Sequence, residues 1–314
     1  MGKIKLKLPA SSANLGAAFD AAALAIALYL EVEAEPAAEF QVYATGRDAD
    51  ACSQVEQNLI IDTYGAMLRD AGREVEPVRL RVHNEIPLGM GLGSSAAARL
   101  AGIAIASKLG GLGWSGDRVL AESAKLEGHP DNVGACWIGG LVTARMSSDC
   151  QVQAIKIDTP VQWPILVAIP PAALSTEEAR GFLPATYTRG DVVTNLQNSL
   201  LMLAAFSQGR GDLLKYALGD RIHEPYREKA CRLLPALRSL VGEHGILGCA
   251  LSGAGPGVLM VMEQKTDLAS AVTEVREYLV QRDLRAEIVS TRIESVGGVE
   301  SYVEQAELAQ GAKL

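Results

Sequence analysis

The stretch that most constrains this chain is PLGMGLGSSAAARLAG, residues 87–102, where three glycines and two serines precede an alanine-rich run. The run predicts a helix over 93–109. A helix start exposes unsatisfied backbone N–H groups and the positive end of the helix dipole, and glycines there let an anion approach the backbone closely. We therefore expect a phosphate-binding loop here.

Two common glycine loops do not match this one. A Walker A loop needs Gly-Lys-Ser/Thr, and a dinucleotide fingerprint needs G-x-G-x-x-G, whereas Gly89, Gly91 and Gly93 run G-x-G-x-G. What remains is a glycine loop that ends in paired hydroxyls. Ser94 or Ser95 could either contact phosphate and ligate the magnesium that accompanies ATP, or form a plain N-cap after a flexible entry.

Composition favours a small-molecule partner. The chain has 314 residues, 48% of them hydrophobic, which is enough for one large or two medium domains. A net charge of −8 provides no positive field to collect nucleic acid or an anionic membrane surface. Five cysteines without CxxC spacing fit free thiols in a cytoplasmic protein, and the apolar run at 21–34 is too short to span a bilayer.

The pattern of strands and helices predicts an α+β chain in two halves, divided near the polar residues 147–151. We expect one domain over 1–150 and a second over 151–314. Alternating or apolar runs predict strands at 4–8, 78–82, 137–146, 163–171, at two places within 245–262, and at 285–293. Helices are expected at 57–72, 93–109, 116–127, 176–182, 191–207, in pieces over 225–243, and at 266–282.

EGHPDN, residues 127–132, follows the third predicted helix. Glu127 can supply a hard oxygen to magnesium, which takes only one or two carboxylates from a protein. His129, Asp131 and Asn132 offer donors and acceptors to a polar substrate. A capped turn, in which Asp131 and Asn132 bond to the local backbone, is the alternative interpretation.

Two small-residue loops carry further candidates. SSANLGAAFD, residues 11–20, follows the first strand and brings Asn14 and Asp20 to the strand's exit end. LSGAGPGV, residues 251–258, joins two apolar strands through glycines that would let a ligand or another backbone come into contact, although a tight hairpin would look the same.

Two arginines are candidates for holding a carboxylate. Arg180 follows Thr176 in STEEAR, and Arg227 ends HEPYR. The planar guanidinium matches a carboxylate with two parallel hydrogen bonds. Surface ion pairs with the neighbouring glutamates are the alternative.

Together these motifs resemble the GHMP small-molecule kinases. PASSANLG…FD, PLGxGLGSSAAA, EGHPDN and LSGAGPG occur in that family's order and spacing, and STEEARGFLP with HEPYR is similar to its homoserine kinase branch. The resemblance covers residues 4 to 300. It implies a two-domain fold, with a ribosomal protein S5 domain 2-like N-terminal half and a ferredoxin-like C-terminal half.

The resemblance also implies an ATP- and magnesium-dependent phosphorylation of L-homoserine, in a homodimer. By the same resemblance, the loop around ATP would comprise Pro87, Leu88, Gly89, Gly91, Leu92, Gly93, Ser94, Ser95 and Ala96, and magnesium would be held by Ser95 and Glu127. The substrate would contact Asn14, Asp20, His129, Thr176, Arg180, Arg227 and Gly253, and catalysis would involve Asn132 and Arg180. The family pattern has a carboxylate base in sister kinases where Asn132 stands here.

Two departures from the family pattern bear on the substrate. Ala17 and Ala18 replace the usual Pro-Gly, and Gly257 replaces a hydroxyl residue. A related kinase with another small alcohol as substrate, a non-catalytic nucleotide-binding relative and a dinucleotide-dependent oxidoreductase therefore remain alternatives.

Overall fold

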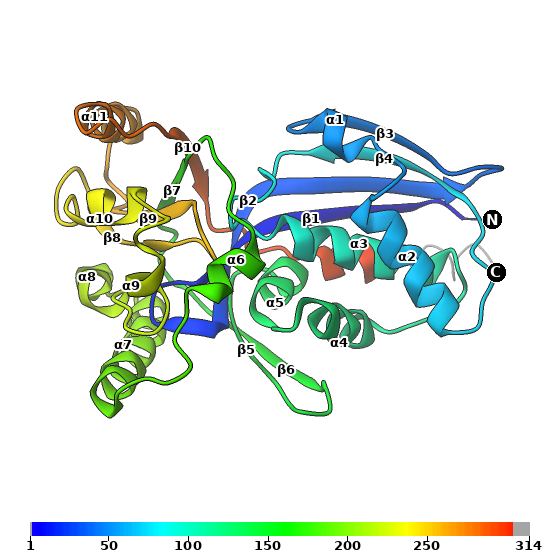
Figure 1. The fold of residues 1–314 in the computed structure, drawn as a ribbon, viewed down its shortest axis with the longest axis horizontal. Helices are drawn as coiled ribbons and strands as arrows, with labels where there is room; N and C mark the ends of the chain where they lie inside the picture. The colour runs from blue at the N-terminus through cyan, green and yellow to red at the C-terminus, as the bar shows by residue number, and fades with distance from the viewer. Residues whose placement is uncertain (1, 304–314) are drawn as a thin grey trace.

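The computed structural model describes residues 2–303, apart from the side chain of Thr176. Two lobes lie side by side, each built on one sheet with helices against it (Figure 1). The first and the last of the described residues both lie in the N-terminal lobe (Figure 1). Within the described residues, no helix has the length and apolarity needed to cross a membrane.

The N-terminal lobe contains a six-stranded sheet organised around one long strand. β2 (Ala18–Pro36) is 19 residues long and pairs antiparallel with β1 (Ile4–Asn14), β4 (Val78–Asn84) and β5 (Leu141–Met146). β3 (Gln41–Gly46) runs parallel to β4 at one edge, and β6 (Val152–Ile157) completes a hairpin with β5. The burial of alternate residues in β4 matches a sheet with one covered face.

Helices cover that sheet (Figure 1). The helices are α1 (Ala49–Cys52), α2 (Leu59–Asp70), α3 (Ser94–Lys108), α4 (Gly116–Glu127) and α5 (Asp131–Ile138). α3 is central: its alanines are buried against α2, α4 and β1, since small side chains let the helix backbones approach closely.

The C-terminal lobe has the strand order β10-β7-β9-β8, antiparallel throughout. Its strands are β7 (Pro164–Ile169), β8 (Ile246–Leu251), β9 (Val258–Met262) and β10 (Glu287–Arg292). The first strand therefore lies between the fourth and the third, as in a ferredoxin-like sheet. The expected α+β fold is confirmed. The helices are α6 (Thr176–Gly181), α7 (Arg189–Gln208), the short η1 (Gly211–Leu213), α8 (Leu214–Ala217), α9 (Glu224–Arg227), α10 (Leu233–Arg238) and α11 (Leu268–Val280).

The two lobes share an apolar core. One cluster of buried residues joins β1, β2 and α3 to β7, β9 and Phe206 of α7, and a second cluster lies beneath α10 and α11. A continuous core of this kind holds the lobes in a defined relation, so residues from both can form one site.

The sheet of the N-terminal lobe extends past the boundary expected at residue 150. β6 pairs with β5, and after β10 the chain returns to the first lobe, where Ile293 bridges to Ile26 and Tyr302 packs on Trp137. We place the division at 158–163, with residues 293–303 belonging to the first lobe.

Most of the expected helices are present within one or two residues of their predicted bounds, but one segment was assigned wrongly. The strand expected at 137–146 begins only at Leu141, because α5 continues to Ile138. α5 is buried on nearly every side and has only eight residues, so it shows no amphipathic pattern.

Candidate active site

A cavity of about 190 Å³ lies where the lobes meet, and most of the candidate residues line it. Those candidates are Asn14, Asp20, Gly89, Gly91, Leu92, Gly93, Ser94, Ser95, Ala96, Glu127, His129, Asn132, Arg180, Arg227 and Gly253. Pro87 and Leu88 are not among the lining residues and face neighbouring hollows instead. Thr176 begins α6, and its side chain lies outside the described part of the structure.

The glycine loop requires glycine for two physical reasons. Gly89, Gly91 and Gly93 have φ of 69°, 74° and 71°, in the left-handed region that side chains disfavour. A Cβ on Gly91 would lie 2.0 Å from the carbonyl oxygen of Ser252, and one on Gly93 would lie 2.0 Å from Ser11 Oγ. The loop is therefore held directly against the loop that follows β8.

The start of α3 is open to an anion. Its N-cap is Gly93, and no side chain caps it, so the interpretation in which Ser94 or Ser95 forms a plain cap is wrong. The carbonyl oxygens of the loop are used elsewhere: that of Leu92 accepts from Ser11 N at 3.1 Å and that of Gly91 from Ser252 Oγ at 2.7 Å. The N–H groups of the first turn of α3 are left to bind phosphate oxygens.

Ser95 and Glu127 meet at the side of this loop. Ser95 Oγ donates to Glu127 Oε1 at 2.5 Å, while Ser94 has no such contact with Glu127. Arg99 Nε lies 2.9 Å from the same carboxylate oxygen, close enough for an ion pair but without the geometry of a hydrogen bond. The hydroxyl and the carboxylate form a pair of hard oxygen ligands for a metal ion next to the phosphate loop.

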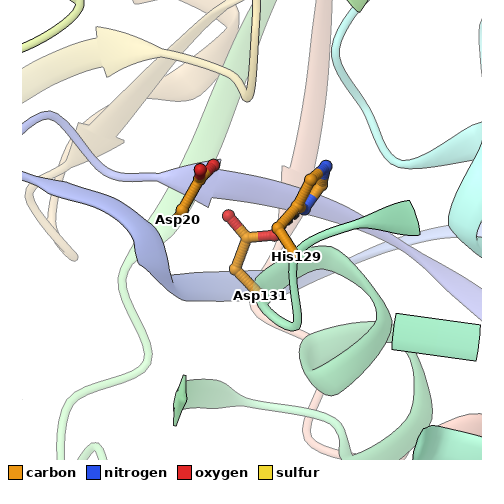
Figure 2. A group of neighbouring side chains, drawn as sticks. All are labelled: Asp20, His129 and Asp131. Atoms are coloured by element: carbon orange, nitrogen blue, oxygen red, sulfur yellow. Dashed lines mark hydrogen bonds and ion pairs between the residues drawn. The ribbon is translucent and has the colours of Figure 1, made fainter. Parts of the chain in front are cut away.

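His129 and Asp131 form a buried pair on the cavity wall (Figure 2). His129 Nδ1 donates to Asp131 Oδ1 at 2.6 Å, and that oxygen also accepts from Asn132 N at 2.6 Å. Burial lowers the pKa of His129, but the hydrogen bond and charge of Asp131, with the charges of Asp20 and Glu127, outweigh it and raise that pKa above its usual value. His129 therefore carries positive charge more readily than a free imidazole.

Asp20, His129 and Asp131 each present a ligand atom within 4.8 Å of the others. Asp20 approaches from β2 and the other two from the start of α5 (Figure 2). Both carboxylates are already engaged, Asp131 with His129 and Asp20 with Arg180, so the cluster forms a polar part of the cavity wall. Asn132 lies beside it, and its Oδ1 accepts from Ser11 Oγ at 2.8 Å.

Asn14 and Asp20 are placed by a strained turn between β1 and β2. Both have positive φ, 73° and 54°, which Asn and Asp tolerate better than most residues. Asn14 Nδ2 donates to the carbonyl oxygen of Gly253 at 2.7 Å, and its Oδ1 accepts from Asp20 N at 3.0 Å. Arg180 Nη2 donates to both oxygens of Asp20, at 2.8 and 3.0 Å.

Arg227 is almost fully buried and points toward the same end of the cavity. Its Nε donates to the carbonyl oxygen of Ala179 at 3.1 Å and its Nη1 to His223 Nδ1 at 3.0 Å. Burial, followed by the positive charge of Arg180, lowers the pKa of Arg227. Two guanidinium groups in one pocket repel each other. An anion that pairs with both of them is therefore bound favourably.

Phe19 is a site residue that sequence reasoning missed. Its ring lies 5.6 Å from Arg180 Cζ and 5.5 Å from Arg227 Cζ, and it stacks on His223 at 5.1 Å. A single aromatic residue has no periodic signal. Its position beside Asp20, in a loop already singled out, was the one available clue.

A second cavity, of about 250 Å³, adjoins the first and shares Ser94 and Ser95 with it. Its lining is mostly apolar and was also missed from the sequence; it includes Leu30, Cys52, Asn58, Leu59, Ile60, Val82, Ile86, Leu88 and Ala98. A flat apolar ring could occupy this cavity while its attached phosphates reach the glycine loop.

The two departures from the family pattern lie at closely held parts of the backbone. The carbonyl oxygen of Ala17 accepts from Asn195 Nδ2 at 2.7 Å and from Ser199 Oγ at 2.5 Å, so α7 holds this turn in place. A Cβ on Gly257 would lie 2.6 Å from the carbonyl oxygen of Met90. A side chain at 257 would therefore press on the phosphate loop.

Comparison with known proteins agrees with the fold. Residues 58–140 match the family described as GHMP kinases N terminal domain, and residues 202–281 match GHMP kinases C terminal. Together with the two-lobed fold and the glycine loop, these matches define a GHMP kinase.

Individual relatives narrow the family further. A homoserine kinase of Solibacter usitatus is 42% identical over 261 residues, which cover 82% of this chain and 85% of the relative. One of Deinococcus radiodurans is 34% identical over 302 residues, covering 95% and 97%. The chain belongs to the homoserine kinase family.

Solved structures show the same fold. The homoserine kinase from Cytophaga hutchinsonii superimposes with a TM-score of 0.79 at 24% identity, covering 95% of this chain and 96% of that one. The mevalonate kinase of L. major in complex with R-mevalonate gives a TM-score of 0.69 at 15% identity, covering 95% and 97%.

Proposed function

We propose that this protein transfers the γ-phosphoryl group of ATP to the hydroxyl of L-homoserine, giving O-phospho-L-homoserine for threonine synthesis. The observation that carries the proposal is that one cavity has an uncapped helix start at one end and two arginines with an aspartate at the other. The first end suits a triphosphate, and the second suits an amino acid.

The nucleotide spans the two cavities in this proposal. The N–H groups of Ser94, Ser95 and Ala96 bind phosphate oxygens, and the base lies in the apolar cavity beside Asn58 and Ile86. Leu88 then contacts the nucleoside rather than the phosphates.

The donors fit magnesium. Ser95 Oγ and Glu127 are hard oxygen ligands in contact with each other, and Mg²⁺ keeps several waters and takes few protein ligands. We assign the ion to Ser95 and Glu127, and to Ser95 rather than Ser94 because only Ser95 touches the carboxylate. A bound magnesium would neutralise charge on the phosphates.

The substrate lies at the other end, with its carboxylate between Arg180 and Arg227 and its ammonium near Asp20. Binding replaces part of the pairing between Arg180 and Asp20, since the zwitterion offers each a partner of opposite charge. Asn14, His129 and Gly253 complete the wall around the side chain that carries the hydroxyl, and Thr176 at the start of α6 is assigned to the substrate as well.

The reaction forms a bond from the substrate oxygen to the γ-phosphorus and breaks the bond from that phosphorus to the bridging oxygen of ADP. Phosphoryl transfer passes through a loose transition state, so positioning and charge neutralisation contribute more than early removal of the hydroxyl proton. Asn132, where sister kinases have a carboxylate, orients the hydroxyl in this proposal. Arg180 stabilises the equatorial charge, and the hydroxyl proton passes late to an oxygen of the transferred phosphoryl group.

Two further properties, the cellular location and the oligomeric state, accompany the proposed activity. We place the protein in the cytoplasm, in keeping with five free cysteines among the described residues. We also expect a homodimer, which size-exclusion chromatography with light scattering measures directly.

The test is ADP release with Mg-ATP and a panel of L-homoserine, mevalonate, galactose, L-serine and L-threonine. Turnover is expected on homoserine alone. The matched control is Glu127→Ala, for which we expect kcat to fall at least a hundredfold because a metal ligand is lost. Turnover on another member of the panel, with homoserine inert, would overturn the substrate assignment and leave the kinase in place. ATP binding without turnover on any of them would indicate a non-catalytic relative.

A further inference from the structure

Glu224 is a buried acid that the proposed mechanism does not use. Its side chain is 0% exposed, and it lies at the start of α9, three residues before Arg227. Burying a carboxylate away from water costs free energy unless its oxygens accept hydrogen bonds or pair with a positive charge. Both oxygens of Glu224 accept hydrogen bonds.

The carboxylate connects three segments of the C-terminal lobe. Glu224 Oε1 accepts from the backbone N–H of Leu251 at 2.7 Å, and Oε2 accepts from Nη2 of Arg238 in α10. Its own N–H donates to Asp220 Oδ2 at 2.7 Å. α9 is thereby joined to the last residue of β8.

Both ends of that connection reach the active site. On one side, α9 carries Arg227, whose guanidinium lines the cavity. On the other, Leu251 precedes Ser252, whose hydroxyl donates to the glycine loop at Gly91 O, and Gly253, whose carbonyl oxygen accepts from Asn14. The Glu224 side chain thus joins the helix that carries Arg227 to the strand that leads into this loop.

We infer that Glu224 is a positioning residue for the substrate carboxylate: by holding α9 to the end of β8, it sets Arg227 at the right distance from the loop that carries Gly253. This inference rests on the proposed function. The glycine loop, which Ser252 also contacts, is held in addition by Ser11 N at Leu92 O and by Gly257 N at Met90 O. Loss of the Glu224 connection should therefore weaken homoserine binding more than ATP binding.

Burial and the neighbouring charge of Asp220 act against ionisation of Glu224, whereas Arg238 favours it; the balance raises the pKa of Glu224 to about 7. Glu224 therefore holds a proton more readily than a free carboxyl group. Its acceptor role toward Leu251 does not require a full charge, which leads to a test that separates length from charge.

Two variants make that separation. Glu224→Asp keeps the charge but shortens the side chain by one methylene, so it cannot reach both Leu251 N and Arg238. Glu224→Gln keeps the length and an acceptor oxygen for Leu251 N, but it removes the charge and replaces the oxygen that accepts from Arg238 with an NH2 group. We expect E224D to raise KM for homoserine at least fivefold with KM for ATP within twofold, and E224Q to leave both within twofold.

Glu228 is the matched control residue. It pairs with the same Arg238, at 3.2 Å, but its side chain is 40% exposed and makes no bond to β8. E228D and E228Q should leave both KM values within twofold. Urea unfolding of all four variants would show whether any change in KM merely follows a loss of stability.

The outcomes of these experiments separate the positioning role of Glu224 from the proposed phosphorylation of homoserine. Wild-type protein that does not phosphorylate homoserine removes the proposed function. An active wild type, with E224D raising both KM values together or neither, overturns the positioning role alone. If E224D does not fold, E224Q is compared with Glu224→Ala, which loses both acceptor oxygens. A KM for homoserine at least fivefold higher in E224A than in E224Q supports the inference, and equal values in the two variants contradict it.

Discussion

Asp20 shows how one residue can be tested without disturbing its backbone. Its φ of 54° is tolerated by Asn, so Asp20→Asn removes the charge and keeps the turn. We expect KM for homoserine to rise at least tenfold in steady-state kinetics, because the substrate ammonium loses its counter-ion.

Stability should hardly change in that variant. The ion pair with Arg180 is about one-third exposed, and such pairs contribute about 0–1 kcal/mol. Asp20→Ala is the contrasting variant, since a strained φ would cost it roughly a further 1 kcal/mol in urea unfolding. An unchanged KM in Asp20→Asn would remove Asp20 from the substrate site.

His223 and Glu224 are adjacent buried groups with opposite pH dependence. Burial first, and then the positive charge of Arg227, lowers the pKa of His223 to about 4, whereas burial raises that of Glu224 to about 7. The unfolded chain takes up the histidine proton near its usual pKa of 6.5, so His223 costs stability as pH falls from 6.5 toward 4. Glu224 takes up its proton in the folded state first, so it adds stability as pH falls from 7 toward 4.5.

Variants separate the two contributions, each worth roughly 3 kcal/mol over its window. As the pH falls from 6.5 to 4.5, the free energy of unfolding of His223→Asn should rise relative to that of the wild type. Over the same range, that of Glu224→Gln should fall relative to the wild type. The free energy of unfolding in urea at pH 7.5, 6 and 4.5 measures both slopes. Parallel curves for the wild type and both variants would contradict the assignment.

Among the elements, the glycine loop should be the least tolerant of change. Gly91→Ala combines a positive φ with a Cβ placed 2.0 Å from a backbone oxygen, so the loop must move. We expect kcat to fall more than tenfold, and the free energy of unfolding to fall by at least twice the loss in the control.

The control is Gly111→Ala. Gly111 has a similar φ of 70° but nothing within 4 Å of the added Cβ, so it should cost only backbone strain, about 1 kcal/mol, with kcat unchanged. Equal effects in the two variants would show that close packing of the loop against Ser252 is unimportant.

The elements that the sequence predicted well are those with a local signal. α3 follows its glycines and serines within one residue of the expected bounds, and the strand, glycine turn and strand at 245–262 are present as β8 and β9. β2 was harder, because its residues 22–26 are buried on both faces and show no alternation. α5 was missed since a short, fully buried helix has no polar face.

Site residues that belong to a recognisable sequence motif were predicted. Those that reach the site only through packing between distant segments were missed. The phosphate loop, Glu127 and His129 carry recognisable neighbours in sequence, and the structure brings them to one cavity. Phe19, Glu224 and the apolar cavity near Asn58 depend on contacts between distant segments. No spacing within a single stretch indicates such contacts.

At the scale of the whole molecule, the last described residues return to pack against the N-terminal lobe. Tyr302 is 3% exposed, packs on Trp137 at 5.4 Å, and its hydroxyl lies 2.8 Å from Ser107 Oγ in α3. We expect Tyr302→Ala to lower the free energy of unfolding by about 3–5 kcal/mol in urea, as for other buried aromatic residues.

Val303→Ala is the neighbouring control. Its side chain is 45% exposed, so the change should stay within about 0.5 kcal/mol. A loss no larger in Tyr302→Ala than in this control would mean that the returning segment does not support the first lobe.

That return has a consequence for how the protein is made. A ribosome releases the N-terminal end first, and early domains ordinarily fold while later ones are still being synthesised. Here residues 293–302, which complete the first lobe through Ile26 and Trp137, emerge only after the whole second lobe. The phosphate-binding half must wait, unfinished, for nearly the entire chain to be translated.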